Sequence, residues 1–240
     1  IVHSASKSSE ILAMAMRTPL APEAKTYLSN LPIHEPSVEM YNVRLKTSSD
    51  EKNLLDSITF RVEPFKKVAF VSRQPAPIRA LFKLICRLYD PLDGKVFIAD
   101  QHLTQYNVTS IRDQIALVGP MSEVLEASLL ENILYGMTSQ EGFSNKLVAD
   151  LLHDLSEGLP CTRRGQDILD RVNKAAEDAF ATDFVAENLE WEITEASLNE
   201  GQRVRLSMAR AFFRNPQIVL IEEPTFWLDR ESEQQIKDAM

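Results

Sequence analysis

Two adjacent glutamates follow the most uniformly apolar stretch of this 240-residue chain. Residues 218–221 read Ile-Val-Leu-Ile, which is typical of a central strand, and Glu222 and Glu223 come directly after them. Carboxylates in such a place can hold a divalent cation or act as a general base. The four histidines are scattered: His3, His34, His102 and His153. Since no third ligand lies at a suitable spacing, we predict no metal site and favour solvated or arginine-paired carboxylates.

A proline-rich stretch before a predicted helix is the second candidate site. Residues 72–80 read Ser-Arg-Gln-Pro-Ala-Pro-Ile-Arg-Ala. Arg79 could hold a phosphate at the helix start, and a solvated or salt-bridged arginine is the alternative. A loop that cradles phosphates needs glycine, because its backbone amides must all point at the ligand. The chain has only 7 glycines, and no two are close enough to build such a loop.

Composition excludes several classes of protein. Hydrophobic residues make up 44% and charged residues 25%, as in ordinary globular proteins and unlike disordered chains. A net charge of −9 argues against nucleic acid as a partner. No apolar run approaches the roughly 20 residues of a membrane span. Cys86 and Cys161 form no metal-binding pair and indicate no disulfide framework.

Hydrophobic periodicity predicts the elements that must position these residues. We expect strands over residues 38–45, 57–62, 67–71, 95–98, 115–118 and 218–221. We expect helices over residues 78–89, 129–135, 146–155, 168–185, 200–213 and 231–240. Strands first, helices in the middle and then helix–strand–helix is an α/β arrangement with a helical insertion. The apolar runs at 67–71 and 218–221 should be neighbours in one parallel sheet.

Several stretches in a fixed order resemble the nucleotide-binding domain of ABC transporters. Residues 198–203, their helix, the strand at 218–221 and residues 222–229 resemble the signature motif, the Walker B strand, the catalytic glutamate and the D-loop. Upstream, residues 115–118 and 131–136 are similar to the flanks of the Q-loop. The resemblance covers nearly the whole chain, and the exporter branch is the better fit. It implies an α/β fold with a P-loop NTPase-like core and a helical subdomain.

The resemblance also implies a domain organisation. Residues 1–37 would be a helix and linker, and residues 38–240 the nucleotide-binding-like domain. Its core would comprise 38–118 and 211–240, and its helical lobe 119–210. We expect the chain to be a piece of a longer polypeptide, with the histidine switch beyond Met240. The segment from Gly136 to Ala175 is longer than the family's usual connection, and it would either pack on its own lobe or dock another protein.

The phosphate loop of that family is replaced in this chain. Ser72, Pro75 and Pro77 stand in the loop, Ile78 stands at its lysine, and Arg79 at its Mg²⁺-binding hydroxyl. Prolines have no N–H to offer a phosphate and fix φ near −65°. Ile78 cannot contact a phosphate, and Arg79 would repel a cation.

The other positions of the composite site differ as well. Thr47 stands at the adenine-stacking aromatic, Pro120 at the Q-loop glutamine, Glu222 at the Walker B aspartate, and Asn199 and Glu200 at the signature's serine and first glycine. Glu200 would place a negative charge against the γ-phosphate of the opposite subunit. Glu223 matches the catalytic glutamate, and we expect it to be idle.

The expected function is therefore that of a non-catalytic ABC-type domain acting as a transporter half or subunit. The alternatives are a structural subunit of a larger membrane-associated assembly and a weak ATPase. We expect no cofactor, with ATP and Mg²⁺ only if hydrolysis persists. The expected partner is another ABC-type domain or a larger assembly, with a transmembrane domain in the same or a partner chain. Such a domain would lie at a membrane on its soluble side, in the cytoplasm or an organelle matrix.

The D-loop-like stretch supplies candidate interface residues: Phe226, Trp227 and Leu228. Aromatic residues are enriched among interface anchors, and this stretch lies where the family's domains meet. Burial under the domain's own lobe is the alternative. We expect this stretch or the long segment from 140 to 174 to contact another chain.

Overall fold

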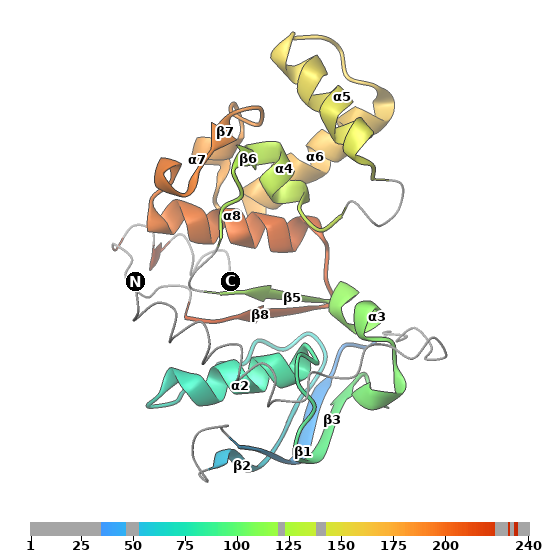
Figure 1. The fold of residues 1–240 in the computed structure, drawn as a ribbon, viewed down its shortest axis with the longest axis vertical. Coiled ribbons are helices and arrows are strands. Elements are labelled where there is room, and N and C mark those ends of the chain that lie inside the picture. Colours follow the sequence, from blue (N-terminus) through green and yellow to red (C-terminus); the bar gives the residue numbers. More distant parts are fainter. Residues whose placement is uncertain are drawn as a thin grey trace, which may run out of the picture. The chain divides into compact units, whose positions relative to one another are not determined.

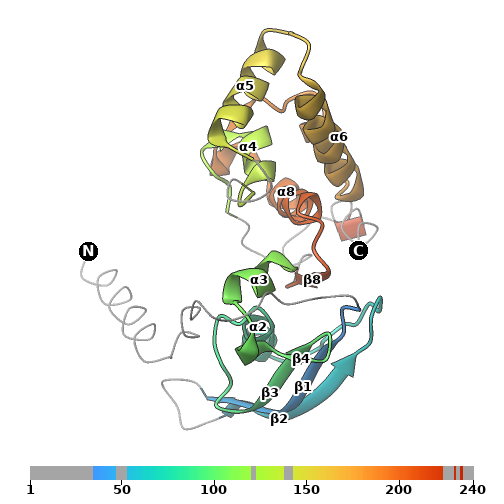
Figure 2. The same ribbon diagram turned by 90° about the vertical axis from the view of Figure 1, so that its right-hand side faces the viewer.

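The structure is a computed structural model of the chain, and it describes residues 35–46, 53–119, 123–137, 143–223, 230, 233 and 234. Contacts divide the chain into two compact units, Ile1–Ile115 and Ala116–Met240 (Figures 1 and 2). The helix predicted before residue 35 and most of the one predicted over 231–240 lie outside the described residues. Within the described part of the chain, no helix is long and apolar enough to cross a membrane.

The first unit contains a four-stranded antiparallel sheet (Figure 2). Its strands are β1 (Val38–Lys46), β2 (Asn53–Val62), β3 (Asp93–Ile98) and β4 (Gln101–His102), in the order β2-β1-β3-β4. Val38 of the central strand β1 pairs with Val62 on one side and Ile98 on the other. The strands predicted over 38–45, 57–62 and 95–98 are confirmed, and β2 begins four residues earlier than predicted.

Helix α2 (Pro75–Ile85) lies against β2 of this sheet. It buries Leu81, Phe82, Leu84 and Ile85. Phe82 meets Phe70 edge to face, with ring centres 6.5 Å apart. After β4 come the short helices η1 (Leu103–Gln105) and α3 (Val108–Asp113).

Gly94 allows β3 to approach β1. Its φ is +85°, a conformation that L side chains rarely adopt. A Cβ at this position would lie 2.3 Å from the backbone oxygen of Asn42. The first residues of β3, Asp93 and Gly94, therefore require glycine at the second position.

The prediction of a buried strand over residues 67–71 is wrong in this structure. The segment is irregular, Val68 is 53% exposed and Val71 is 93% exposed. An apolar run becomes a buried strand only when another strand supplies its hydrogen bonds, and the described strands of the first unit pair with one another. Phe70 alone is half-buried, through its contacts with Phe60 and Phe82. The expected pairing of this segment with residues 218–221, which belong to the second unit, stays a prediction.

The second unit pairs its strands in twos. Strand β5 (Ile115–Val118), which begins at the last residue of the first unit, pairs with β8 (Ile218–Ile221). Strand β6 (Ala127–Ser128) pairs antiparallel with β7 (Glu192–Ile193). The strands predicted over 115–118 and 218–221 are confirmed with the same bounds.

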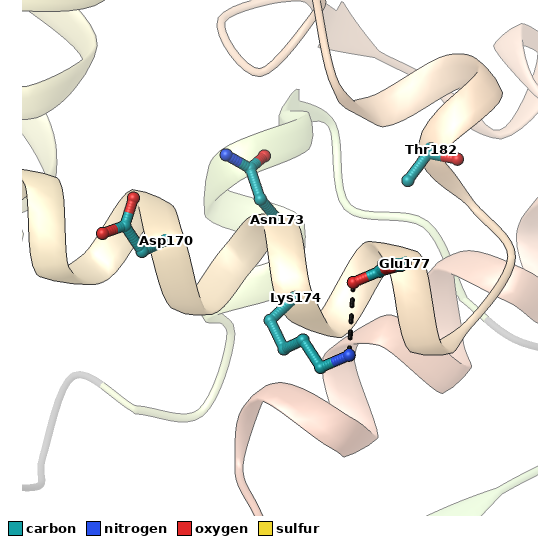
Figure 3. A pocket seen from close by; sticks show the side chains of 5 residues that line it. All are labelled: Asp170, Asn173, Lys174, Glu177 and Thr182. Carbon is teal, nitrogen blue, oxygen red and sulfur yellow. Dashed lines mark hydrogen bonds and ion pairs between the residues drawn. The ribbon is translucent and has the colours of Figure 1, made fainter.

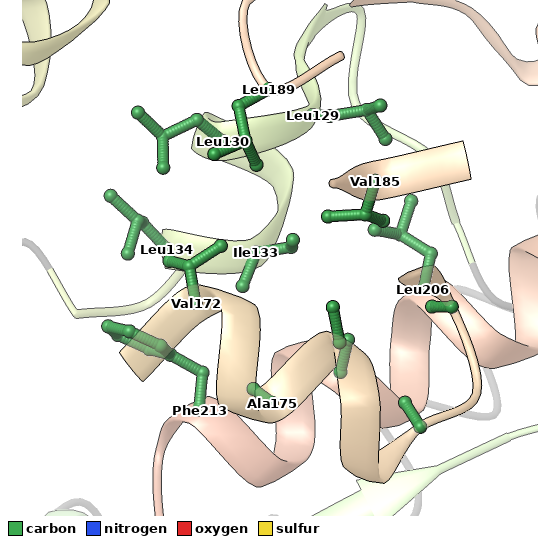
Figure 4. Packing of buried hydrophobic residues seen from close by; sticks show 14 of the residues in the cluster. Leu129, Leu130, Ile133, Leu134, Val172, Ala175, Val185, Leu189, Leu206 and Phe213 are labelled. Atoms are coloured by element: carbon green, nitrogen blue, oxygen red, sulfur yellow. The ribbon is translucent and has the colours of Figure 1, made fainter. Parts of the chain in front are cut away.

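The helices of the second unit enclose one apolar core (Figure 4). They are α4 (Leu129–Leu134), α5 (Asn145–Ser156), α6 (Arg163–Asp178), α7 (Thr182–Val185) and α8 (Glu200–Phe213), with the short η2 (Glu195–Ser197) before α8. Helices α4, α6 and α8 supply Ile133, Val172 and Leu206, each almost fully buried. The burial of one face on each helix stabilises the unit by removing apolar surface from water.

Helix α6 begins five residues before the predicted helix over 168–185. Thr162 caps it, because its side chain accepts a hydrogen bond from the amide of Gly165. The first turn is polar and shows no hydrophobic periodicity. The start predicted from that periodicity is therefore too late. The helix ends at Asp178, and α7 forms the last part of the predicted range after a break at residues 179–181. The assignment of residues 211–240 to a strand-rich core stays a prediction.

Candidate functional site

The candidate phosphate position in the first unit is the first turn of helix α2. Gln74 is the N-cap residue and makes no side-chain capping bond, while Pro75 and Pro77 occupy the first and third helical positions. Prolines fit there because φ is already helical and no intrahelical N–H bond is lost. The four amides before the first intrahelical bond normally face outward and can bind an anion.

Few of those amides remain for a ligand. The two prolines have none, and the amide of Gln74 donates to the Ser72 hydroxyl at 3.3 Å. The amide of Ala76 is the one first-turn donor that these features leave. Ile78 and Arg79 follow, both half-buried in the second turn. The helix dipole and Arg79 still favour an anion here, but without the converging amides of a phosphate loop.

The two glutamates stand at the end of β8 in the second unit. The amide of Glu222 donates to the carbonyl of Val118 at 2.8 Å, so the ends of β5 and β8 lie side by side. Glu223 has φ +43°, which is uncommon for a residue other than glycine. Both side chains are half-buried. Among the described residues, no group of three or more histidines, cysteines, aspartates or glutamates could hold a metal ion.

The predicted signature position lies at the start of α8 in the second unit. Asn199 is its N-cap and accepts a hydrogen bond from the amide of Gln202 at 2.8 Å. In return, the side chain of Gln202 accepts from the amide of Asn199 at 3.0 Å. This capping box satisfies two amides at the helix start within the helix itself. Glu200 follows, exposed, in the first helical position, where its charge interacts favourably with the helix dipole.

The predicted site residues fall into separate groups. The first unit contains the group at the start of α2: Ser72, Pro75, Pro77, Ile78 and Arg79. Glu222 and Glu223 follow β8, and Asn199 and Glu200 begin α8, in the second unit. Five of the predicted site residues lie outside the described residues: Thr47, Pro120, Phe226, Trp227 and Leu228.

The amphipathic segment predicted over 146–155 forms α5, which buries Val148 and Leu151. Leu147, Leu152 and Leu155 are partly buried against the core of the second unit. Gly165 at the start of α6 allows a close approach, since a Cβ there would lie 3.1 Å from the side chain of Leu151. This packing accounts for the apolar face of α5 within its own unit.

The sequence analysis missed a surface hollow on α6 and α7 (Figure 3). Its volume is about 590 Å³, and it is lined by Asp170, Asn173, Lys174, Glu177 and Thr182. The ammonium group of Lys174 lies 2.8 Å from Asp178 and 3.2 Å from Glu177. Its hydrogen bonds to Asp178 and Glu177 raise the pKa of Lys174. The i,i+3 and i,i+4 spacing could have revealed these ion pairs, which indicate a solvated helix face.

Comparison with known proteins identifies the family. The family model described as ABC transporter matches residues 55–226. The ABC-type transporter fsqE of Aspergillus fumigatus is 31% identical over 198 residues, which are 80% of this chain and 14% of that protein. The ATP-dependent lipid A-core flippase of Xylella fastidiosa is 29% identical over 208 residues, 85% of this chain and 31% of that protein.

A solved structure gives the same result for the fold. A bacterial Atm1-family ABC exporter with ATP bound matches 91% of this chain and 35% of its own, with 26% identity and a TM-score of 0.71. The chain thus spans between 14% and 35% of the length of these three proteins. The predicted α/β fold of the ABC ATPase type is confirmed. The chain therefore belongs to the ABC transporter family and has the fold of that family's ATPase domain.

Proposed function

We propose that this domain has lost ATP hydrolysis and serves as a non-catalytic half or subunit of an ABC transporter. The observation that supports the proposal is the first turn of α2, in which Pro75 and Pro77 have no backbone amide to offer a phosphate. Ile78 adds no charge, and Arg79 adds a cation where a metal-binding hydroxyl is needed. These residues suit the start of a helix, but they leave few backbone amides to bind the phosphates of a nucleotide.

Magnitudes favour this interpretation. A hydrogen bond to a charged group contributes about 1.5–3 kcal/mol. Losing three such contacts would weaken nucleotide binding by a factor of at least ~10³. The positive charge of Arg79 also cannot restore catalysis, because the positioning of the reacting groups supplies most of the rate enhancement in phosphoryl transfer.

The residues present do not fit Mg²⁺ either. That ion requires near-octahedral oxygen ligands, commonly one or two carboxylates together with substrate phosphates. Glu222 and Glu223 could offer carboxylates, but the sequence has Arg79 at the position where the family has its hydroxyl ligand. Without a bound Mg²⁺–phosphate substrate, Glu223 has no water to activate and is an idle remnant.

The surface that this chain would lend to a partner supports the same proposal. The capping box of Asn199 and Gln202 uses amides at the start of α8, and Glu200 adds a negative charge. A γ-phosphate brought to this helix end would meet fewer donors and a like charge. A dimer with a complete ABC domain would then have a deficient component in each composite site.

The relatives indicate the assembly. Since the matched proteins are transporters and exporters, we infer that this domain pairs with another ABC half and with a transmembrane domain, in the same or a partner chain. It would lie at a membrane, on the soluble side. The alternatives are a weak ATPase, in which Glu223 would act as the general base, and a structural subunit of a larger assembly.

Nucleotide titration and turnover test the proposal. The chain should show no saturable binding of a fluorescent ATP analogue in the presence of Mg²⁺, and no phosphate release above background. Glu223→Gln should change neither result. Glu187→Gln, an exposed glutamate away from the candidate positions, is the matched control.

Turnover that Glu223→Gln abolishes and Glu187→Gln preserves would establish the weak ATPase instead. A native complex that contains no transmembrane domain in this polypeptide or in its partners would favour the structural subunit. Mass spectrometry of the native complex distinguishes the structural subunit from the transporter half.

A further inference from the structure

Asp93 and Gly94 begin strand β3, and they are the one Asp-Gly or Asn-Gly pair in the sequence. The side chain of Asp93 is 59% exposed. Its Oδ1 accepts a hydrogen bond from the amide of Gly94 at 2.9 Å. The carboxyl group of one residue is thus folded back onto the next backbone nitrogen, and that nitrogen belongs to a residue with no side chain to hinder an approach.

The ladder between β3 and β1 is interrupted at Gly94 (Figure 2). Asp93 pairs with Arg44 and Lys95 pairs with Tyr41, and the register shifts between these two pairs. Residues 42 and 43 of β1 therefore lie opposite Gly94 alone, as in a β-bulge. A bulge disrupts the ladder locally, so Gly94 is not held in a regular pair.

The nearby arginine does not draw the carboxyl group of Asp93 away from this amide. Nη1 of Arg44 lies 3.8 Å from Oδ2 of Asp93, which is the other oxygen of the carboxylate. The same guanidinium is closer to Asp56, at 3.4 Å, and to the hydroxyl of Ser57, at 3.0 Å. Oδ1 of Asp93 therefore stays with the Gly94 amide.

We propose that the peptide bond between Asp93 and Gly94 is a site of spontaneous isomerisation to isoaspartate in the folded protein. The carboxyl group first takes a proton from solvent, and the amide nitrogen of Gly94 then attacks its Cγ. The new N–Cγ bond closes a succinimide ring, the nitrogen loses its proton, and the Cγ hydroxyl leaves as water. The structure favours this step because it already holds the two groups in contact.

Water then opens the ring in one of two ways. Addition at Cγ breaks the new N–Cγ bond and restores aspartate. Addition at the main-chain carbonyl carbon of residue 93 breaks its bond to nitrogen and gives isoaspartate. The water released in the first step is replaced in the second, so the mass of the protein does not change and no other reactant is needed.

The product would not fit the start of β3. Isoaspartate adds the Cβ of residue 93 to the main chain and so lengthens it. On one side, the backbone at Gly94 is so close to β1 that a Cβ there would lie 2.3 Å from the oxygen of Asn42. On the other side, the amide of Leu92 donates to the oxygen of Arg44 at 2.9 Å. A longer chain cannot keep both contacts, so the isomerised protein should be less stable.

Prolonged incubation of the 240-residue chain at neutral pH tests the proposal. Peptide mapping with electron-transfer fragmentation quantifies isoaspartate at each position. Asp56 is the internal comparison, because its side chain is 65% exposed and also near Arg44, but Ser57 follows it. We expect isoaspartate at residue 93 to form about 10-fold faster than at residue 56. Asp93→Glu is the matched control: it keeps the charge, but its longer side chain closes a ring far more slowly.

A synthetic peptide of residues 88–98 separates the effect of the fold from the reactivity of the bare sequence. Because the fold holds the two groups together, isomerisation in the folded protein should proceed at no less than about one tenth of the rate in the peptide. A slower rate in the folded protein would overturn the proposal, and so would a rate at Asp93 no greater than at Asp56. The isomerised fraction, separated by chromatography, should unfold at a lower urea concentration than the unmodified protein. Equal midpoints would overturn the predicted effect on β3.

Discussion

Proline does two things at once at the start of α2. At the first and third helical positions it pre-sets the helical φ and lacks an amide that has no intrahelical partner there. Pro75 and Pro77 therefore suit the helix while removing the donors that a phosphate would need. Residues that favour a helix can thus remove the amides through which its start would bind an anion.

Gly94 offers a prediction about backbone strain. Gly94→Ala should destabilise the protein by roughly 2–4 kcal/mol, because the new Cβ would meet the Asn42 carbonyl and φ is +85°. Gly136→Ala is the control: its φ is +88°, but a Cβ there would meet open space. It should cost only about 1 kcal/mol. Urea denaturation followed by circular dichroism measures both, and equal losses would contradict the close approach.

The two cysteines should differ in reactivity. Burial raises the pKa of Cys86 to about 11, although nearby Arg112 opposes the shift. At pH 8 about one thousandth of this thiol would be ionised, and the thiolate is the reactive form. Cys161 is partly exposed. Iodoacetamide at pH 8 should therefore modify Cys161 first, as read by mass spectrometry of the intact protein and its peptides. Equal labelling of the folded protein would disprove this.

The pKa of Cys86 also has a consequence for stability at high pH. Because the folded protein holds this proton more tightly than the unfolded chain, Cys86 contributes stability below pH 9. That contribution is lost as the pH rises toward about 11. Cys86→Ala should flatten this part of the curve of unfolding free energy against pH. An equally steep fall in the variant would assign it to other groups.

At the level of elements, α8 is held by its own termini as well as by the core. Asn199→Ala should lower the free energy of unfolding by about 1 kcal/mol, because the amide of Gln202 loses its acceptor. Asn199→Ser is the matched control, since serine also caps helices, and it should have little effect. Thermal unfolding measures the difference. If the two variants lose the same stability, the cap does not stabilise α8 as described.

Helices and strands with strong hydrophobic periodicity were predictable from the sequence. Contacts between residues that are far apart in the sequence were not. Helix α8 and strand β8 have the predicted bounds, because their apolar spacing and flanking caps agree. Residues 67–71 failed because a short apolar run does not specify a pairing strand. The hydrogen bond from the side chain of Arg210 to the backbone oxygen of Asn132 joins positions 78 residues apart, and no local pattern predicts it.

At the scale of the whole molecule, the family could be predicted from dispersed motifs in order, and the comparisons confirm it. The assembly stays a prediction. We expect Trp227→Ala combined with deletion of residues 140–164 to lose a partner from the native complex, because the D-loop-like stretch and the long segment from 140 to 174 are the predicted contact segments. Each alteration alone is the control. Retention of every partner at native stoichiometry by the folded double variant would contradict this.

The apolar run at residues 67–71 affects how readily the protein aggregates in solution. The stretch Lys-Val-Ala-Phe-Val combines high β-propensity with the exposed side chains of Val68 and Val71, and such segments promote aggregation when they are free to meet one another. Lys66 and Lys67 at one end, and Pro75 beyond the other, have the character of gatekeepers that slow this process. Lys66→Ala with Lys67→Ala should therefore shorten the lag before turbidity appears in concentrated solution, whereas Val71→Lys should lengthen it.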